Sequence, residues 1–235
     1  MRGCLPSSSP RSGAAALILK RPLTTMLLVP LVAGFAIDGR AEAFVRDDII
    51  VDPDPALFNI CHGHGCANLA WVKLSPEQWQ QVRLVFAKPA DTAAEERAQI
   101  GAGIARLEKI VGPMTGTAGD KGGNLEGLGL YGQMDCIDES TNTTIYLRML
   151  QKYGLMRWHS VADRATRWSL LTWPHTTAVI RERDSLARWA VDSWFLDNGE
   201  PPFILPLDTW RRGWRPPEGA TRKAETRTQP GAAAQ

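Results

Sequence analysis

The chain has almost no excess of charge of either sign. Its 235 residues include 27 Lys and Arg against 25 Asp and Glu, a formal net charge of +2. Residues 1–43 hold five basic and two acidic residues, which leaves 22 basic and 23 acidic residues in the remainder. Proteins that bind nucleic acid or anionic membranes electrostatically show a basic excess or patch. The composition therefore predicts no nucleic-acid partner.

The sequence also lacks an apolar run of the roughly 20 residues that a transmembrane helix needs. The run Leu23–Ile37 has fifteen residues, and the small residues Ala41 and Ala43 behind it have the spacing of a cleavage site. Four basic residues precede the run: Arg2, Arg11, Lys20 and Arg21. We predict a signal peptide over residues 1–43 and a periplasmic or secreted mature protein without an integral membrane domain. An uncleaved membrane anchor is the alternative.

Cysteine is scarce, with four in the chain. Cys4 leaves with the predicted signal peptide, so an exported chain keeps three. Disulfides form in oxidising compartments, and an odd count leaves one thiol over. Cys61 and Cys66 can close a short loop, which would leave Cys136 free. Two histidines between Cys61 and Cys66 make a metal-binding module the alternative for this segment.

Internal repeats and a GxxxxGK[ST] phosphate loop are absent as well. We predict one domain over residues 44–215 and a disordered tail over 216–235, which is rich in Pro, Gly, Ala and charge. Helical patterns come first, at residues 74–87, 91–111 and 136–153. Strand patterns follow, at residues 158–161, 167–171, 176–181, 188–195 and 203–207. Helices followed by antiparallel strands predict an α+β fold.

Cys136 is placed at the start of the third predicted helix, with Asp135 as its N-cap. The unpaired N–H groups of a helix start favour an anion, which predicts a stabilised thiolate, the reactive form of cysteine. Asp135 and Asp138 partly oppose this effect. A small buried core residue is the alternative interpretation of Cys136.

His175 begins one predicted strand, and Asp192 lies on the next. A hairpin centred between Arg183 and Asp184 places His175 directly opposite Asp192, with Cβ atoms roughly 5 Å apart. A carboxylate beside a histidine is the orienting contact that a Cys-His pair requires. Asp197 is the alternative acid, if the hairpin is centred later in the sequence.

A cysteine at a helix start, a histidine on a strand and an acid on the next strand resemble the transglutaminase-like superfamily. Asp135–Asp138 (Asp-Cys-Ile-Asp) is similar to the Asp-Cys-Glu-Asp motif of bacterial transglutaminase-like cysteine proteinases. The resemblance covers about residues 70–210. It implies a papain/transglutaminase-like core, in which the cysteine-bearing helix packs on an antiparallel sheet, and a triad of Cys136, His175 and Asp192.

The resemblance implies an exported thiol enzyme that acts on amide bonds in protein or peptide substrates. Cys136 would attack the carbonyl, His175 would move the proton, and Asp192 would orient the imidazole. The backbone N–H of Cys136 would form part of an oxyanion hole, with Gln133 as the candidate second donor. Water as the acceptor gives hydrolysis and an amine gives acyl transfer, and the sequence leaves both open.

Some members of this family bind calcium through acidic groups around the cysteine. Asp135, Asp138 and Glu139 are the candidate oxygen ligands here, whereas Ile137 replaces an acidic residue of the motif. We therefore expect no cofactor, with calcium as the alternative. The competing function is that of a catalytically inactive relative, which binds a partner through its surface.

Overall fold

The computed structural model describes residues 46–124, 129–169, 172–218 and 220. The predicted signal peptide over residues 1–43 lies outside the described residues. Of the predicted tail, only residues 216–218 and 220 are described. Among the described helices, none is long and apolar enough to span a membrane.

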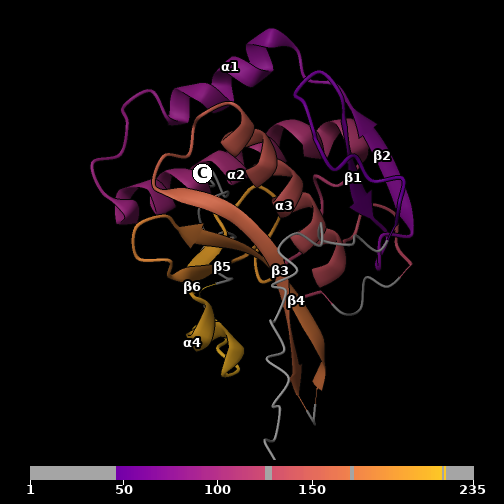
Figure 1. The fold of residues 1–235 in the computed structure, drawn as a ribbon. Helices are drawn as coiled ribbons and strands as arrows, with labels where there is room; N and C mark the ends of the chain where they lie inside the picture. The colour runs from indigo at the N-terminus through magenta and orange to yellow at the C-terminus, as the bar shows by residue number, and fades with distance from the viewer. Residues whose placement is uncertain (1–45, 125–128, 170–171, 219, 221–235) are drawn as a thin grey trace, which may run out of the picture. The chain divides into compact units, whose positions relative to one another are not determined.

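Helices and antiparallel sheets are combined in the described part of the chain (Figure 1). In chain order the elements are β1 (Phe58–His62), β2 (Asn68–Val72), α1 (Pro76–Val85), α2 (Ala93–Thr115), α3 (Cys136–Lys152), β3 (His159–Ser169), β4 (Thr172–Glu182), β5 (Arg188–Asp192), β6 (Phe203–Pro206) and α4 (Leu207–Arg211). One sheet pairs β1 with β2, and the other has the order β3-β4-β5-β6. The predicted α+β class is confirmed.

Helices α1 and α2 begin two residues later than the predicted ranges, which start at residues 74 and 91, and α2 also runs further. Ser75 caps α1 in a capping box with Gln78. The predicted stop of α2 before Pro113 is wrong, because the helix continues to Thr115 and ends at Gly116, whose φ is +79°. Pro113 lacks the N–H that would otherwise donate to the Lys109 carbonyl, but the Gly112 carbonyl accepts the N–H of Gly116 and, at 3.0 Å, that of Thr117. The last turn therefore keeps its hydrogen bonds.

The strands differ more from prediction than the helices do. Residues 159–161 and 167–169 of two separately predicted segments belong to one strand, β3, whose hairpin with β4 extends beyond β5 and β6 (Figure 1). The rest of the second predicted segment, residues 170–171, lies outside the described residues. The hairpin of β1 and β2 is not predicted, because every residue of β1 is buried and the strand shows no polar alternation. Helix α4, five residues long, is also not predicted.

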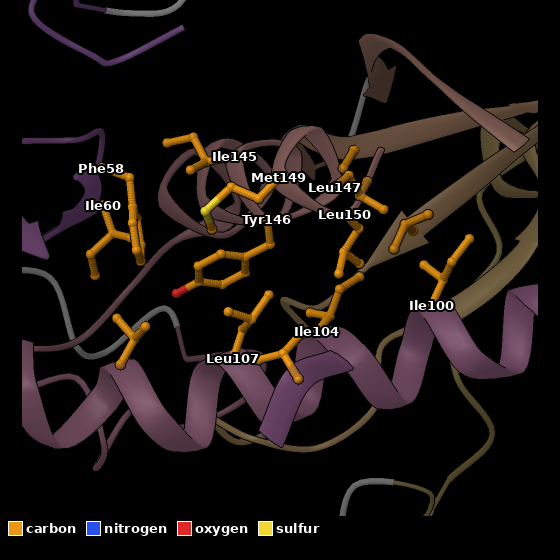
Figure 2. Close-up of a cluster of buried hydrophobic side chains, with 14 of the residues drawn as sticks. Phe58, Ile60, Ile100, Ile104, Leu107, Ile145, Tyr146, Leu147, Met149 and Leu150 are labelled. Carbon is orange, nitrogen blue, oxygen red and sulfur yellow. The ribbon is translucent and has the colours of Figure 1, made fainter. Parts of the chain in front are cut away.

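The hydrophobic core lies between α2, α3 and the strands. Ile100, Ile104 and Leu107 recur at helical spacing on one face of α2, and all three are fully buried. Figure 2 shows these side chains facing those of α3, with β1 at one end of the cluster. The α3 residues are Ile145, Tyr146, Leu147, Met149 and Leu150, and the β1 residues are Phe58 and Ile60. Each buried Ile or Leu contributes roughly 1.5–3 kcal/mol.

Helix α3 is also joined to the strands by buried polar side chains. Asn142 Oδ1 accepts the N–H of Cys61 at 2.7 Å, and its Nδ2 donates to the Cys61 carbonyl at 2.8 Å. Thr143 Oγ1 hydrogen-bonds to Ser193 Oγ, directly after β5, at 2.8 Å. Because α3 also packs against β3 and β4, its first residue, Cys136, has a well-defined position relative to both sheets.

Two glycines of α2 provide a matched test of this packing. A Cβ added at Gly103 would lie 2.8 Å from two ring atoms of buried Phe86, whereas at Gly101 the nearest atoms are 3.8 Å away. Glycine inside a helix costs roughly 0.5–1 kcal/mol relative to alanine, so Gly101→Ala should raise the free energy of unfolding by about this amount. Gly103→Ala should lower it by about 1–3 kcal/mol through overpacking. Urea denaturation measures both, and equal effects would contradict the prediction.

Candidate active site

Cys136 is the first residue of α3, and its sulfur lies against the start of β4. Asp135 caps the helix by accepting the N–H groups of Ile137 and Asp138, both at 3.0 Å. Cys136 is a half-buried free thiol. Its Sγ contacts the carbonyl oxygen of Pro174 at 3.8 Å, and the nearby N–H of Thr176 favours the thiolate and so lowers the pKa of the thiol. The sulfur therefore lies beside the backbone on both sides of His175.

His175 and Asp192 are in direct contact. His175 Nε2 lies 2.7 Å from Asp192 Oδ2, and both side chains are buried. A carboxylate only accepts hydrogen bonds, so a neutral imidazole in this position carries its proton on Nε2. The other nitrogen, Nδ1, is buried and has no hydrogen-bond partner among the described residues. The ring thus keeps an unused lone pair, as a general base requires.

The predicted hairpin register is wrong by two residues, although the contact that it predicted is present. The strands pair Ala178 with Val191, and the turn is closed by the N–H of Glu182 and the carbonyl of Ala187. Continued along the strands, this register places Asp192 opposite Thr177 rather than opposite His175. Residues two apart on a strand share one face, so Asp192 reaches His175 as a diagonal neighbour.

Aromatic rings surround the imidazole. The ring centroids of Trp194, Phe195 and Trp210 lie 4.9, 5.2 and 5.4 Å from that of His175. Trp210, on α4, also donates its Nε1–H to Asp192 Oδ2 at 2.6 Å, so one carboxylate oxygen accepts from both Trp210 and His175. The sequence alone does not place these tryptophans beside His175, because no local pattern connects α4 with β5.

The structure places Asp197 and Gln133 in a different role. Asp197 accepts the ammonium group of Lys121 at 2.7 Å and the N–H of Gly122 at 3.0 Å. Gln133 Oε1 accepts a hydrogen bond from Asn124 Nδ2 at 2.6 Å. Its Nε2 donates at 3.0 Å to a backbone carbonyl of the glycine-rich loop that joins α2 to α3. Both side chains therefore hold the loop between α2 and α3, and neither has a hydrogen bond to His175 in the described part of the chain.

This glycine-rich loop supports the aromatic side of the site. A Cβ at Gly122 would lie 2.5–2.6 Å from backbone atoms of Leu196, so only glycine allows this approach. The N–H of Gly123 donates to the Trp194 carbonyl at 2.6 Å. The loop thus packs directly on the segment that carries Trp194 and Phe195.

Electrostatics at Cys136 are opposite to the sequence prediction. Burial raises the pKa of the Cys136 thiol to about 11, and the charges of Asp135 and Asp192 raise it further. The N–H of Thr176 lowers it, but not enough to offset burial. The helix start therefore does not produce a resting thiolate. At neutral pH the sulfur is a thiol, and its reaction requires a base.

The predicted disulfide between Cys61 and Cys66 is present, with the Cα atoms 4.6 Å apart, and it closes the loop between β1 and β2. Four consecutive loop residues have left-handed φ values: Gly63 (+86°), His64 (+70°), Gly65 (+62°) and Cys66 (+59°). A non-glycine residue costs roughly 1–2 kcal/mol in this region. The other contacts of the loop must offset this cost.

Those contacts involve two of the candidate calcium ligands. Asp138 accepts the N–H groups of His64 and Cys66 at 2.8 and 2.7 Å, and Asp135 accepts that of Gly65 at 2.9 Å. Within the described ranges, one group of ligand atoms is close enough to hold one ion, namely Cys61, Cys66 and Asp138. Its two sulfurs are bonded to each other, and Glu139 is not part of it. The candidate calcium ligands Asp135, Asp138 and Glu139 are therefore not gathered into one group in the described part of the chain.

A cluster of buried carboxyl groups lies behind Cys136, formed by Glu108, Asp120, Asp138 and Glu139. Burial raises the pKa of Glu108 to about 8 and those of Asp120 and Asp138 to about 7. It raises the pKa of Glu139 well above its usual range, and the charges of Glu108 and Asp120 add to the effect. The folded protein therefore holds protons near neutral pH that the unfolded chain would release.

Stability should consequently fall as the pH rises. Between the ordinary value near 4.5 and about 8, Glu108 binds more protons in the folded state than in the unfolded chain. Glu108→Gln should flatten the decline of the free energy of unfolding from pH 5 to pH 8. Over this range the variant should lose less of that free energy than the natural protein does, by about 1 kcal/mol or more. Urea denaturation across this range measures the effect, and parallel profiles for the two proteins would contradict it.

No family model, no curated protein and no solved structure matches this chain.

Proposed function

We propose that the protein is an exported thiol-dependent amide hydrolase or acyltransferase that acts on protein or peptide substrates. The observation that carries this proposal is the 2.7 Å contact between His175 Nε2 and Asp192, which leaves Nδ1 free. The Cys136 sulfur lies against the backbone of the two residues that flank His175. The expected nucleophile, base and orienting acid lie on neighbouring segments, in the chain order that the transglutaminase-like resemblance implies.

The mechanism begins with a turn of the thiol. In the resting arrangement Sγ contacts the Pro174 carbonyl, and catalytic hydrogen bonds in an enzyme without substrate often tighten only when substrate binds. Rotation of the Cys136 side chain directs S–H to His175 Nδ1. The imidazole takes the proton as sulfur bonds to the amide carbon, and Asp192 stabilises the imidazolium that forms.

The tetrahedral intermediate needs donors for its oxyanion. The N–H of Cys136, as the first residue of α3, has no partner within the helix. Gln133, the expected second donor, is engaged with the glycine-rich loop. Trp194 Nε1 is a better candidate, because it is buried without a partner among the described residues and its ring packs on His175. Two donors are the usual requirement of such a site.

The second half of the reaction releases the products. The C–N bond breaks as His175 returns its proton to the leaving amine, and a thioester on Cys136 remains. His175 then removes a proton from water or from a second amine, which attacks the thioester and restores the thiol. Water yields a carboxylic acid and an amine yields a new amide, so one site serves hydrolysis or transfer.

The disulfide supports export as part of the proposal. Disulfides persist in oxidising compartments and are rare in the cytosol. Cys61 and Cys66 are 0% and 1% exposed and form a bond inside the core, which agrees with the signal peptide expected over residues 1–43.

A specific observation also favours a second candidate, a catalytically inactive relative that binds a partner. The pKa of the Cys136 thiol is raised to about 11, and Sγ contacts a backbone carbonyl rather than the imidazole. In such a protein His175 would serve only as part of the aromatic core. Thiol reactivity distinguishes the two candidates.

Iodoacetamide labelling, followed by peptide mass spectrometry, measures this reactivity. His175→Gln should slow the alkylation of Cys136 at pH 7.5 by about tenfold or more, because the base is lost. His159→Gln is the matched control. His159 is a fully buried histidine on the neighbouring strand, hydrogen-bonded to Glu96 at 2.9 Å, so its loss should destabilise the protein without slowing alkylation. Equal rates in the natural protein and His175→Gln would favour the inactive relative.

A second prediction concerns the shared oxygen of Asp192. Trp210→Phe keeps an aromatic ring but removes the N–H donor, and the alkylation rate of Cys136 should fall about fivefold, the equivalent of about 1 kcal/mol for one hydrogen bond. Asp192→Asn should reduce the rate further, because it disturbs the tautomer of His175. Trp189→Phe is the control, since Trp189 Nε1 has no partner within the described residues. A larger effect at Trp189 than at Trp210 would refute this role.

A further inference from the structure

The loop closed by Cys61 and Cys66 is built around the start of α3. The loop has an unusual backbone, with left-handed φ values at four successive residues, two of which are not glycine. This conformation turns successive N–H groups toward one side, as in the anion-binding concavities called nests. Here the anions are side chains of the protein itself.

The hydrogen bonds from the loop are directed at the residues on either side of Cys136. Asp138 accepts from His64 and Cys66 with its two different oxygens, and Asp135 accepts from Gly65. Asp138 is 0% exposed, so water cannot replace these donors while the fold is intact.

Two more contacts extend the attachment beyond the first turn. The N–H of Gly63 donates to the Gln133 carbonyl at 2.9 Å, three residues before Cys136. Cys61 is paired through both backbone groups with the Asn142 side chain, six residues after it. The loop therefore binds the chain on both sides of the candidate nucleophile.

We propose that the disulfide loop of residues 61–66 is the positioning device of Cys136. Its backbone N–H groups donate hydrogen bonds to Asp135 and Asp138. These bonds hold the first turn of α3 so that the thiol stays half-buried beside His175. The inference deepens the proposed thiol chemistry and rests on it for its functional meaning. Cys61, Cys66 and Asp138 are positioning residues, because they act through Cys136.

The groups around the sulfur explain why its reactivity reports on the loop. Asp135 from its own helix and Asp192 from β5 act on the thiol by charge, and Thr176 of β4 acts by its N–H. When the loop no longer donates hydrogen bonds to Asp135 and Asp138, the Asp138 carboxylate needs water as its hydrogen-bond partner. The first turn of α3 then opens to solvent. Cys136 then moves into solvent, where its pKa falls from about 11 toward the ordinary value of about 8.5.

The experiment combines release of the loop with removal of the base. The double variant Cys61→Ser/Cys66→Ser is prepared alone and with His175→Gln, and alkylation of Cys136 by iodoacetamide is followed by peptide mass spectrometry from pH 7 to pH 10. Asp138→Asn provides a second release variant if the double variant does not fold by circular dichroism. Val82→Ala, a fully buried residue of α1, controls for loss of stability alone.

In the His175→Gln background, release should accelerate alkylation at pH 8 by about tenfold or more, since more thiolate forms as the pKa falls. In the variant whose loop is released, His175→Gln should no longer change the alkylation rate of Cys136. A double-mutant cycle measures this loss of effect. Val82→Ala should change neither quantity. If the alkylation rate of Cys136 depends on pH in the loop-release variant as it does in the intact protein, the loop has no positioning role. If His175→Gln has no effect on the intact protein, the proposed enzyme fails, while the acceleration at pH 8 still decides the role of the loop.

Discussion

The burial of a polar helix is the constraint on which the rest of this structure depends. Helix α3 places an almost continuous polar run, Asp138–Thr144, inside the protein. Buried polar groups are costly unless each finds a partner. Asn142 therefore pairs with the backbone of β1, Thr143 with Ser193, and Asp138 with the disulfide loop. These pairings set the positions of β1, β5 and the loop relative to Cys136.

The same burial determines the chemistry that the site can perform. Carboxyl groups on α3 and α2, among them Glu139 and Glu108, have raised pKa values because they are buried, and burial also raises the pKa of the Cys136 thiol. A site of this kind does not hold a preformed thiolate. In the proposed mechanism, His175 takes the proton, so the reaction depends on the contacts that fix the imidazole.

The imidazole is fixed mainly by aromatic packing and by one carboxylate oxygen. Trp194, Phe195 and Trp210 surround the ring, and Asp192 Oδ2 accepts from both His175 and Trp210. The glycine-rich loop supports this side of the site through Gly122 and Gly123, while the disulfide loop supports the cysteine side. Two loops without catalytic groups of their own thus hold the two halves of the candidate site.

The sequence by itself determined the features that depend on neighbouring residues. The capping residues Ser75 and Asp135 and the pairing of Cys61 with Cys66 follow from local hydrogen bonding and loop length. The tertiary structure alone decided features that depend on distant partners. Helix α2 continues through Pro113, and strand β1 is buried along its whole length. The shifted register makes Asp192 a diagonal neighbour of His175, and Trp210 donates a hydrogen bond to the same carboxylate. Burial keeps the Cys136 thiol protonated. Burial and long-range pairing set each of these, and neither is visible in the spacing of residues along the chain.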